Sequence, residues 1–315
     1  MSRYKPYLAA MIVCLSLFLI AGCPEDDEST TQSKPGTLGV DWHLRTLSLS
    51  ATGIDWDGTR FVAVTFDDTT LTSSDAARWT KHTNAIPGAF ARPFYAGGKH
   101  LARFQSDWVA WADSSLTWTL SNYRGTWPVE DFAYGAGLLV IVSAGDGIHT
   151  STDGSSWTWQ VHTDYRIDVV CWDGDRFVAT NGTVTLLSDD GITWTPHLVN
   201  GGGTYLTADC LACNDDRLVL IGNKRLDTAT IMISTSSDGI NWETDTLADY
   251  KHVNDLVWTG SQFLACGNRG QLLVSPDGLD WQLVPVVTSA DLYQIAVSPN
   301  QWVIVGNDNT LLVSP

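Results

Sequence analysis

The chain has few basic residues and very little glutamate, and both shortages narrow its possible functions. Its 18 Lys and Arg stand against 35 Asp and Glu, which gives a formal net charge of −17. Nucleic acids and anionic membrane surfaces are bound by clustered Lys and Arg, so we expect no nucleic-acid partner. The only glutamates are Glu25, Glu28, Glu130 and Glu243, beside many aspartates. Because Asp favours turns and helices use Glu freely, and because no apolar period of 3.6 residues is sustained after residue 24, the composition indicates an all-β protein.

Cysteine and histidine are too scattered to predict a metal centre. Outside the first 23 residues the cysteines are Cys171, Cys210, Cys213 and Cys266. Cys210-Leu-Ala-Cys213 has the spacing of a metal knuckle, but it falls in a predicted strand, where residues three apart face opposite sides. No histidines form a close pair, and no loop has a calcium-binding pattern. We therefore expect no metal and no cofactor, and buried thiols, with a disulfide such as Cys171–Cys210 as the open alternative.

The N-terminal segment predicts export. Residues 1–6 carry Arg3 and Lys5, residues 7–20 are almost wholly apolar, and Ala21-Gly22 precede Cys23. This is a secretory signal, too short and too abruptly ended for a membrane span. Its ending resembles the bacterial lipobox, which implies that residues 1–22 are a lipoprotein signal peptide and that Cys23 is acylated and begins the mature chain. An ordinary signal peptide cut nearby is the alternative.

The residues that follow predict a tether to a membrane. Residues 24–36 are polar and acidic without apolar anchors, which is typical of disorder. We therefore assign residues 23–37 to the lipidated cysteine and a flexible linker with a reach of roughly 20 Å. Pro24 rather than Asp follows the cysteine, which by the enteric sorting rule favours the outer membrane of a bacterial cell envelope over the inner one.

A repeated motif then dominates the rest of the chain. Ser-x-Asp-Gly-x-x-Trp occurs at 151–157, 188–194, 236–242 and 275–281, and 73–79 keeps all but the glycine. The motif tryptophans stand at 42, 79, 118, 157, 194, 242 and 281. Ahead of most motifs lies a strand, a Gly-containing turn and a second strand, as in Ile54–Val64. Each repeat therefore predicts four short strands, A to D, with the motif in the C–D hairpin.

The two ends of the chain complete each other. Leu311–Pro315 matches Leu272–Pro276 but stops before the motif, whereas Leu38–Trp42 matches the missing half at 277–281. The final blade should therefore take strand D from the N-terminus and strands A to C from the C-terminus, which closes a ring of sheets and hides its edges. We predict a seven-bladed β-propeller over residues 38–315, large enough to be a monomer.

These repeats resemble the BNR or Asp-box family. The same repeat occurs in sialidases, sorting receptors, glucanases and a photosystem II assembly factor, so the resemblance implies the fold and not an activity. In a turn the Asp accepts backbone N–H bonds, Gly supplies a positive φ and Trp anchors the hairpin, so the motif is interpreted as structural. The residues concerned are Asp75, Trp79, Asp153, Trp157, Asp190, Trp194, Asp238, Trp242, Asp277 and Trp281.

Function should lie on the opposite face, which the D–A and B–C loops build. Several of these loops place aromatic residues beside cations, and blade 5 adds loops at 201–205 and 222–227. Arg and Tyr dominate binding hot spots. The alternative is that these cations only form ion pairs with neighbouring aspartates such as Asp168. The candidate ligand-binding residues are Arg92, Tyr123, Arg124, Trp127, Tyr165, Arg166, Tyr205, Lys224, Arg225, Tyr250 and Lys251.

Two functions compete on this face. The first is a non-catalytic, membrane-anchored platform that binds a protein or glycan partner, for example in envelope complex assembly. The second is a glycoside hydrolase of sialidase type, in which Arg92, Arg124 and Arg166 would imitate the arginine triad of that family. That family resembles six-bladed propellers with a Phe-Arg-Ile-Pro phrase, and this chain has only Ala91-Arg92-Pro93-Phe94. We therefore favour a binding protein and name no catalytic residue.

Overall fold

The computed structural model describes residues 39, 41–105, 107–123, 125–161, 163, 166–199, 207–224, 227–247, 252–285 and 288–315. The predicted signal peptide (1–22), Cys23 and the linker to residue 37 lie outside these residues and stay predictions. In the part of the chain that is described, no helix is long and apolar enough to cross a bilayer.

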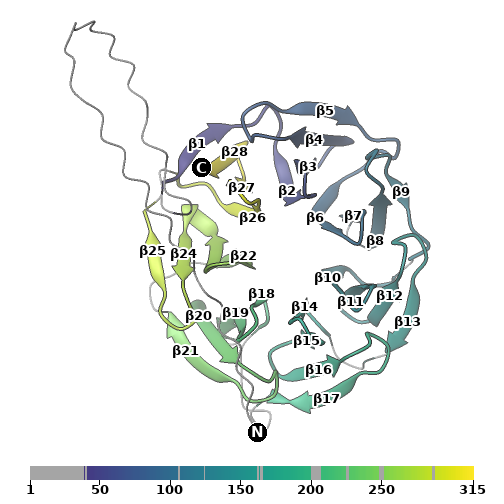
Figure 1. The fold of residues 1–315 in the computed structure, drawn as a ribbon, viewed down its shortest axis with the longest axis vertical. Helices are drawn as coiled ribbons and strands as arrows, with labels where there is room; N and C mark the ends of the chain where they lie inside the picture. The colour runs from purple at the N-terminus through teal and green to yellow at the C-terminus, as the bar shows by residue number, and fades with distance from the viewer. Residues whose placement is uncertain are drawn as a thin grey trace, which may run out of the picture. The chain divides into compact units, whose positions relative to one another are not determined.

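Seven four-stranded antiparallel sheets surround a central channel, as predicted (Figure 1). Blade 1 is β2 (Ala51–Trp56), β3 (Phe61–Thr65), β4 (Thr69–Ser73) and β5 (Thr80–Thr83); blade 2 is β6 (Phe90–Ala96), β7 (Lys99–Phe104), β8 (Trp108–Ala112) and β9 (Thr119–Leu120). Blade 3 is β10 (Val129–Gly135), β11 (Leu138–Ser143), β12 (Gly147–Ser151) and β13 (Thr158–Val161); blade 4 is β14 (Val169–Trp172), β15 (Phe177–Thr180), β16 (Val184–Ser188) and β17 (Thr195–Leu198).

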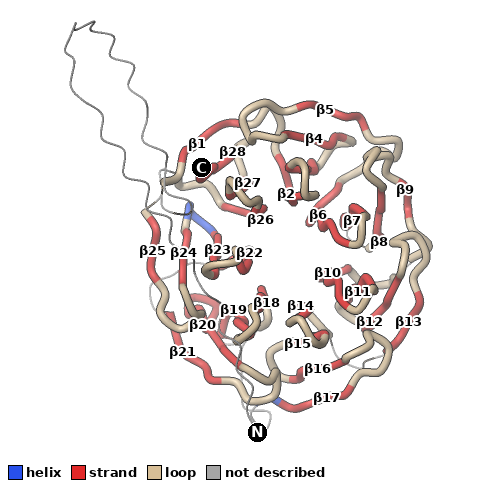
Figure 2. The backbone as a smooth tube through the Cα atoms, viewed as in Figure 1, coloured by secondary structure: helices blue, strands red, loops and turns tan. Residues whose placement is uncertain are grey.

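The remaining three blades complete the ring. Blade 5 is β18 (Cys210–Cys213), β19 (Leu218–Lys224), β20 (Asp227–Ser236) and β21 (Glu243–Leu247); blade 6 is β22 (Val253–Trp258), β23 (Phe263–Gly267), β24 (Leu272–Ser275) and β25 (Gln282–Val284). Blade 7 is β26 (Leu292–Val297), β27 (Trp302–Gly306), β28 (Thr310–Ser314) and β1 (His43–Thr46), and one 3-10 turn, η2 (Asn268–Gly270), follows β23. In every blade the first strand lies innermost, and loops join the strands at the two faces of the ring (Figure 2).

Blade 7 confirms the predicted closure. Strand β1 pairs antiparallel with β28, from His43 opposite Val313 to Thr46 opposite Thr310. The Gly39 N–H donates to the Ser314 hydroxyl at 2.6 Å, which ties the start of the propeller to its last strand. Strands from the two ends of the propeller therefore share one sheet, and blade 7 has four strands like the other blades.

The hydrophobic core lies between neighbouring blades. The second strand of most blades is apolar on both faces, as in Phe61–Val64, because it is sandwiched between the sheets on either side; β7 of blade 2, which carries His100 and Arg103, is an exception. Leu101 and Val109 of blade 2, for example, pack with Leu139 and Ile141 of blade 3. Seven such interfaces hold the ring, so the repeat needs its neighbours to bury its apolar faces.

The Asp-box carboxylates lie in the C–D hairpins and bond to backbone there. Asp75 accepts the N–H groups of Ala77 and Arg78 at 2.9 Å each. The same pair of bonds is made by Asp153, Asp190, Asp238 and Asp277. The glycines of these four boxes have φ between 70° and 81°. The Trp157 indole N–H donates to the Gly154 carbonyl at 3.0 Å, a bond that also closes the boxes of Trp194, Trp242 and Trp281.

The loop expected at 222–227 in blade 5 is mostly strand. Strands β19 and β20 extend their pairing through Gly222 and Asn223, opposite Met232 and Ile231. The β19–β20 hairpin is therefore longer than expected, since its backbone hydrogen bonds continue past the point where strands B and C end in the other blades. The four described cysteines, Cys171, Cys210, Cys213 and Cys266, are free thiols, and Cys213, not Cys210, neighbours Cys171.

Candidate functional site

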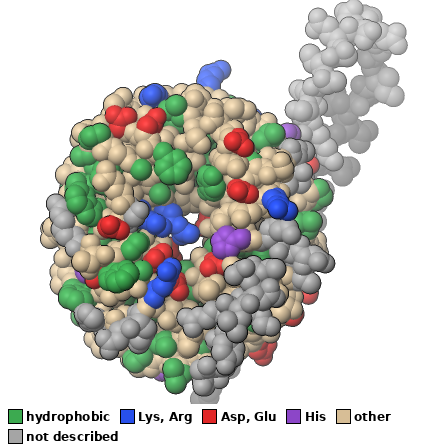
Figure 3. Space-filling view, turned by 180° about the vertical axis from the view of Figure 1, so that it is seen from behind, with side chains coloured by type: hydrophobic (Ala, Val, Ile, Leu, Met, Phe, Trp, Pro, Cys, Tyr) green, Lys and Arg blue, Asp and Glu red, His purple; other side chains and the backbone are tan. Residues whose placement is uncertain are grey.

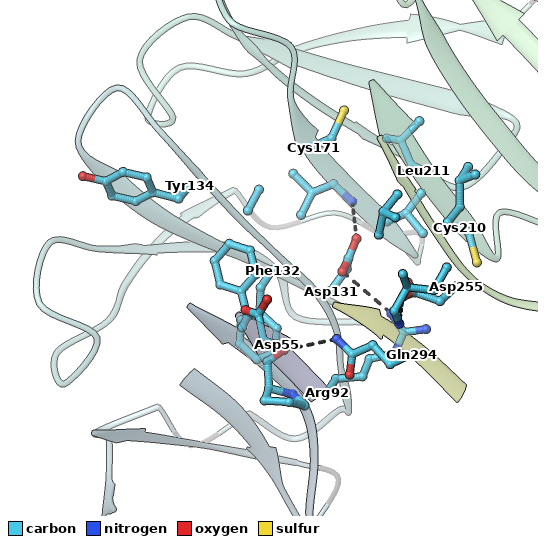
Figure 4. Close-up of a pocket in the computed structure, with 18 of the residues that line it drawn as sticks. Asp55, Arg92, Asp131, Phe132, Tyr134, Cys171, Cys210, Leu211, Asp255 and Gln294 are labelled. Atoms are coloured by element: carbon cyan, nitrogen blue, oxygen red, sulfur yellow. Dashed lines mark hydrogen bonds and ion pairs between the residues drawn. The ribbon is translucent and has the colours of Figure 1, made fainter. Parts of the chain in front are cut away.

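The innermost strands line a channel with an unusual polar wall. Its cavity of about 390 Å³ is bounded by Asp55 from β2, Arg92 from β6, Asp131 from β10, Asp255 from β22 and Gln294 from β26. Figure 4 shows these five side chains around the same opening. Acidic side chains therefore interrupt strands that are otherwise apolar and buried.

Each channel carboxylate bonds to the backbone of the next blade. Asp131 accepts the Val170 N–H at 3.0 Å, and Asp255 accepts the Ile295 N–H at 2.8 Å. Asp55 accepts the Tyr95 N–H in the same way.

Gln294 makes the corresponding connection from blade 7. Its amide accepts the Ile54 N–H at 3.3 Å and donates to the Pro93 carbonyl at 3.1 Å. A Cβ at position 53 would lie 2.4 Å from the Gln294 Oε1, so only glycine fits there. Like the carboxylates, this amide links neighbouring inner strands by hydrogen bonds.

Burial makes the carboxylates hard to ionise. Desolvation raises the pKa of Asp55 to about 7, against the opposing N–H groups of Trp56 and Tyr95. It raises the pKa of Asp131 to about 6, where Arg92 opposes it, and it also raises the pKa of Asp255. At neutral pH the channel wall is therefore less negative than its composition suggests.

Arg92 reaches into this ring from an irregular point of β6. The strand is bulged between Ala91 and Phe94, and Arg92 has φ 46°, which is rare for a residue other than glycine. Its guanidinium lies 3.8 Å from Asp131 and donates to the Asn254 carbonyl at 3.4 Å. Burial opposes the charge of Arg92, but Asp131 and the other carboxylates outweigh it and raise the pKa of the guanidinium.

The channel opens on the D–A face into a charged pocket, the mouth. Its cavity is about 180 Å³, and its lining includes Arg92, Arg103, Glu130, Arg166, Asp168, Asp209 and His252. Figure 3 shows basic, acidic and histidine side chains gathered around the opening on this face. The mouth therefore combines both signs of charge in a small space.

Two arginines of the mouth are placed differently. Arg166 has 58% of its side chain exposed, lies 3.2 Å from Glu130 and also bonds Asp168. The Arg103 Nε is buried and has no hydrogen-bond partner among the described residues. Burial, with Arg92 nearby, lowers the pKa of Arg103. A buried guanidinium N–H without an acceptor is costly, so the Arg103 Nε needs an acceptor that the described residues do not supply.

The structure separates the candidate residues chosen from sequence. Arg92 and Arg166 meet at the mouth, whereas Tyr123 is buried between blades 2 and 3 and Trp127 is exposed beside Gly145. Lys224 ends β19. Arg124, Tyr165, Tyr205, Arg225, Tyr250 and Lys251 lie outside the described residues and stay predictions.

Sequence reasoning missed Arg103 and the channel acids. In strand B the register aligns Arg103 with Val64, Val142, Ile221, Cys266 and Val305 of other blades, so a charged residue in an otherwise uncharged, mostly apolar position was a signal. Asp131, next to Glu130, and Asp255 were equally visible as acids inside predicted inner strands. Within the described ranges, no three His, Cys, Asp or Glu side chains are grouped to hold a metal ion.

Comparison with known proteins yields structural likeness only. No protein-family profile and no curated protein sequence matches the chain. A structure of YCF48 bound to a D1 peptide is 21% identical with a TM-score of 0.64, covering 90% of this chain and 99% of that one.

Two other solved structures match at lower identity. The WD40 propeller domain of Doa1 is 14% identical with a TM-score of 0.66, covering 88% of this chain and 97% of that one. Virginiamycin B lyase from Staphylococcus aureus is 9% identical with a TM-score of 0.70, covering 87% and 100%. A binding protein and an enzyme share this architecture, so the likeness shows that this chain is a seven-bladed β-propeller and leaves its function to the site.

Proposed function

We propose that this protein is a non-catalytic, membrane-tethered propeller that binds a segment of a protein partner at the mouth of its channel. The observation that carries the proposal is the buried Arg103 Nε without an acceptor beside the half-exposed Arg166. Guanidinium groups pair with carboxylates through two parallel hydrogen bonds, and arginine dominates binding hot spots. The partner should therefore present a carboxylate, from an acidic side chain or a chain end.

The surrounding charges support a selective site. Glu130 and Asp168 hold Arg166 in place, so a ligand carboxylate competes with bonds inside the protein and must match their geometry. The structure of YCF48 bound to a D1 peptide gives a precedent for peptide binding on this architecture. That likeness supports the class of partner and does not carry over any residue.

The membrane tether belongs to the same proposal. Acylated Cys23 and the linker to residue 37 would hold the propeller near a bacterial outer membrane, within reach of envelope proteins during assembly. Cys23→Ala should move the protein from the membrane fraction to the soluble fraction and abolish labelling by a palmitate analogue. Membrane retention of that variant would refute the anchor and leave the mouth unaffected.

A sialidase-type hydrolase is the second candidate, because Arg92, Arg103 and Arg166 surround one opening. That chemistry also needs a tyrosine nucleophile next to a glutamate. Glu130 lines the described part of the mouth, but no tyrosine does. Hydrolysis of a fluorogenic sialoside by the wild type, lost in Arg103→Ala, would favour this candidate.

The decisive experiment is in-membrane crosslinking of the tagged lipoprotein followed by mass spectrometry. The wild type is compared with Arg103→Ala/Arg166→Ala, and with Arg78→Ala/Lys81→Ala as a control that removes the same charge from exposed positions on blade 1. We expect one protein partner, recovered about tenfold less with the mouth variant and equally with the control. Equal recovery with both variants would remove the mouth as the binding site.

A further inference from the structure

Blade 3 departs from the repeat at one buried position. Two residues before the motif serine, strand C carries Leu71, Leu186, Leu273 and Leu312 in four blades, Ala110 in blade 2 and Ser234 in blade 5, all nearly without exposure. Blade 3 has His149 there. In blade 1, Leu47 of the preceding D–A loop lies in the same cluster as Leu71, whereas in blade 3 Tyr123 takes that place next to His149.

A pocket lies between blades 2 and 3, where Tyr123 and His149 replace the aliphatic residues found in blade 1. Its volume is about 330 Å³, and its lining includes Tyr123, Asp146, His149, Trp157 and Trp159. The His149 ring stacks on Trp159, with centroids 5.8 Å apart and planes 6° from parallel. Tyr123 meets His149 edge-on at 5.0 Å, and half of Trp159 is exposed at the entrance. Pockets of this size enclose one small ring.

The His149 Nδ1 in this pocket has no hydrogen-bond partner within the described chain, and the buried Tyr123 hydroxyl has only the Ser143 hydroxyl beside it. Tyr123 is 3% exposed, and the nearby Ser143 hydroxyl already donates to the Gly147 carbonyl and accepts the Asp146 N–H. A Cβ at position 125 would lie 2.2 Å from the Tyr123 oxygen, so only glycine leaves room for the hydroxyl there. Buried polar atoms are almost always satisfied, so a ligand or water must supply these bonds.

Burial keeps both groups uncharged at neutral pH. It raises the pKa of Tyr123 to about 12 and lowers the pKa of His149 to about 4. Tyr123 therefore offers a hydroxyl donor, and neutral His149 offers one donor and one acceptor nitrogen. Neither group carries a charge that would attract an ion, and the carboxylate of Asp146 at the pocket edge disfavours an anion.

We propose that the pocket formed by Tyr123, His149 and Trp159 binds one neutral sugar ring of a glycan. The C–H face of a sugar packs on an aromatic ring, and its hydroxyls both donate and accept hydrogen bonds. An aromatic side chain of a protein partner would fill the same space, but it would leave the Tyr123 and His149 atoms unsatisfied. Asp146, already bonded to Thr126, lies at the edge of the pocket as a further acceptor.

The test is saturation-transfer NMR of the full propeller with methyl β-glucopyranoside, methyl β-N-acetylglucosaminide and p-cresol as probes. We expect at least one glycoside to bind and to shift the indole N–H resonance of Trp159, assigned with Trp159→Phe. Tyr123→Phe and His149→Leu should each weaken that binding about tenfold, because each removes a bond that only the ligand completes. Leucine is the residue of four sibling blades, so His149→Leu should fold.

Further variants separate this site from the mouth and from a loss of folding. Arg103→Ala/Arg166→Ala should leave glycoside affinity unchanged while it impairs the mouth, so this site and the proposed protein-binding function fail independently. Thermal unfolding of each variant checks the fold, and Tyr123→Phe retains the ring if His149→Leu is unstable. Binding of p-cresol alone, no glycoside binding, or glycoside affinity unchanged in both pocket variants would each overturn the proposal.

Discussion

The channel and the Asp-box rim use the same side chain in opposite environments. Asp55 and Asp131 lie inside the ring, where desolvation raises their pKa values to about 7 and about 6. Asp238 sits in a hairpin at the rim, where desolvation raises its pKa but the hydrogen bonds from Asn241, Ile240 and Ser236 together outweigh it and lower the pKa to about 2. Both kinds of carboxylate accept backbone N–H bonds, so exposure to water decides the direction of the shift.

This difference gives the two regions opposite responses to pH. A carboxyl whose pKa is raised by folding favours the folded state below its ordinary value of 3.8 and loses that contribution as the pH rises through the folded value. A carboxyl whose pKa is lowered contributes stability above 3.8 and loses it as the pH falls through the folded value. The channel is therefore relatively weakened by alkali, and the rim by acid.

The largest expected effect comes from removing a channel carboxylate. Asp131→Ala should lower the free energy of unfolding by about 3 kcal/mol, because the Val170 N–H loses its acceptor and the partly buried Arg92 loses its nearest carboxylate. Urea unfolding at pH 7 measures this, with Asp131→Asn as the matched variant that retains one acceptor and costs less. A loss for Asp131→Ala below that of Asp131→Asn would contradict the role of the inter-blade bond.

A second test follows the pH response of the channel. Between pH 4 and pH 8 the wild type should lose about 2 kcal/mol more unfolding free energy than Asp55→Asn, because the amide never ionises. This is less than the pKa of about 7 alone would give, since water enters the channel. The slope of unfolding free energy against pH is the measurement, and parallel slopes for the two proteins would exclude Asp55 as the titrating group.

The rim should give a smaller effect of the opposite sign. Asp238→Ala should cost about 1 kcal/mol at pH 7, since the carboxylate accepts two N–H groups as a helix N-cap does. The difference from the wild type should shrink as the pH falls from 4 towards 2, the window between the unfolded and folded pKa values. A difference that grows in acid would mean that the rim does not act through its ionised carboxylate.

Sequence predicted the regular parts of this molecule and missed the exceptions. Seven repeats with a conspicuous tryptophan allowed the blade number and the β1–β28 closure to be counted, because identical units must pack identically. The channel acids could not be placed, since their environment depends on inner strands from several different blades. Tyr123 was expected among binding residues on the D–A face, but it is buried beside His149, a contact between blades that no local pattern reveals.

The smallest predicted effect concerns the one full Asp box without glycine. Ala76 has φ 53°, a left-handed conformation that costs residues with a Cβ about 1–2 kcal/mol. Its carbonyl accepts a bond from Arg45, and the buried Trp79 indole N–H has no partner in the described chain, unlike Trp157 bonded to Gly154. Ala76→Gly should stabilise the protein by about 0.5 kcal/mol. The substitution relieves the backbone strain, and this gain slightly exceeds two costs: the loss of a buried methyl group and the greater backbone entropy of glycine in the unfolded state. The change in unfolding temperature measures this effect. The matched control is Gly154→Ala, which should destabilise the protein because it introduces a Cβ at a residue with positive φ. If both substitutions changed the stability in the same direction, backbone strain in the turn would not determine the stability of this rim.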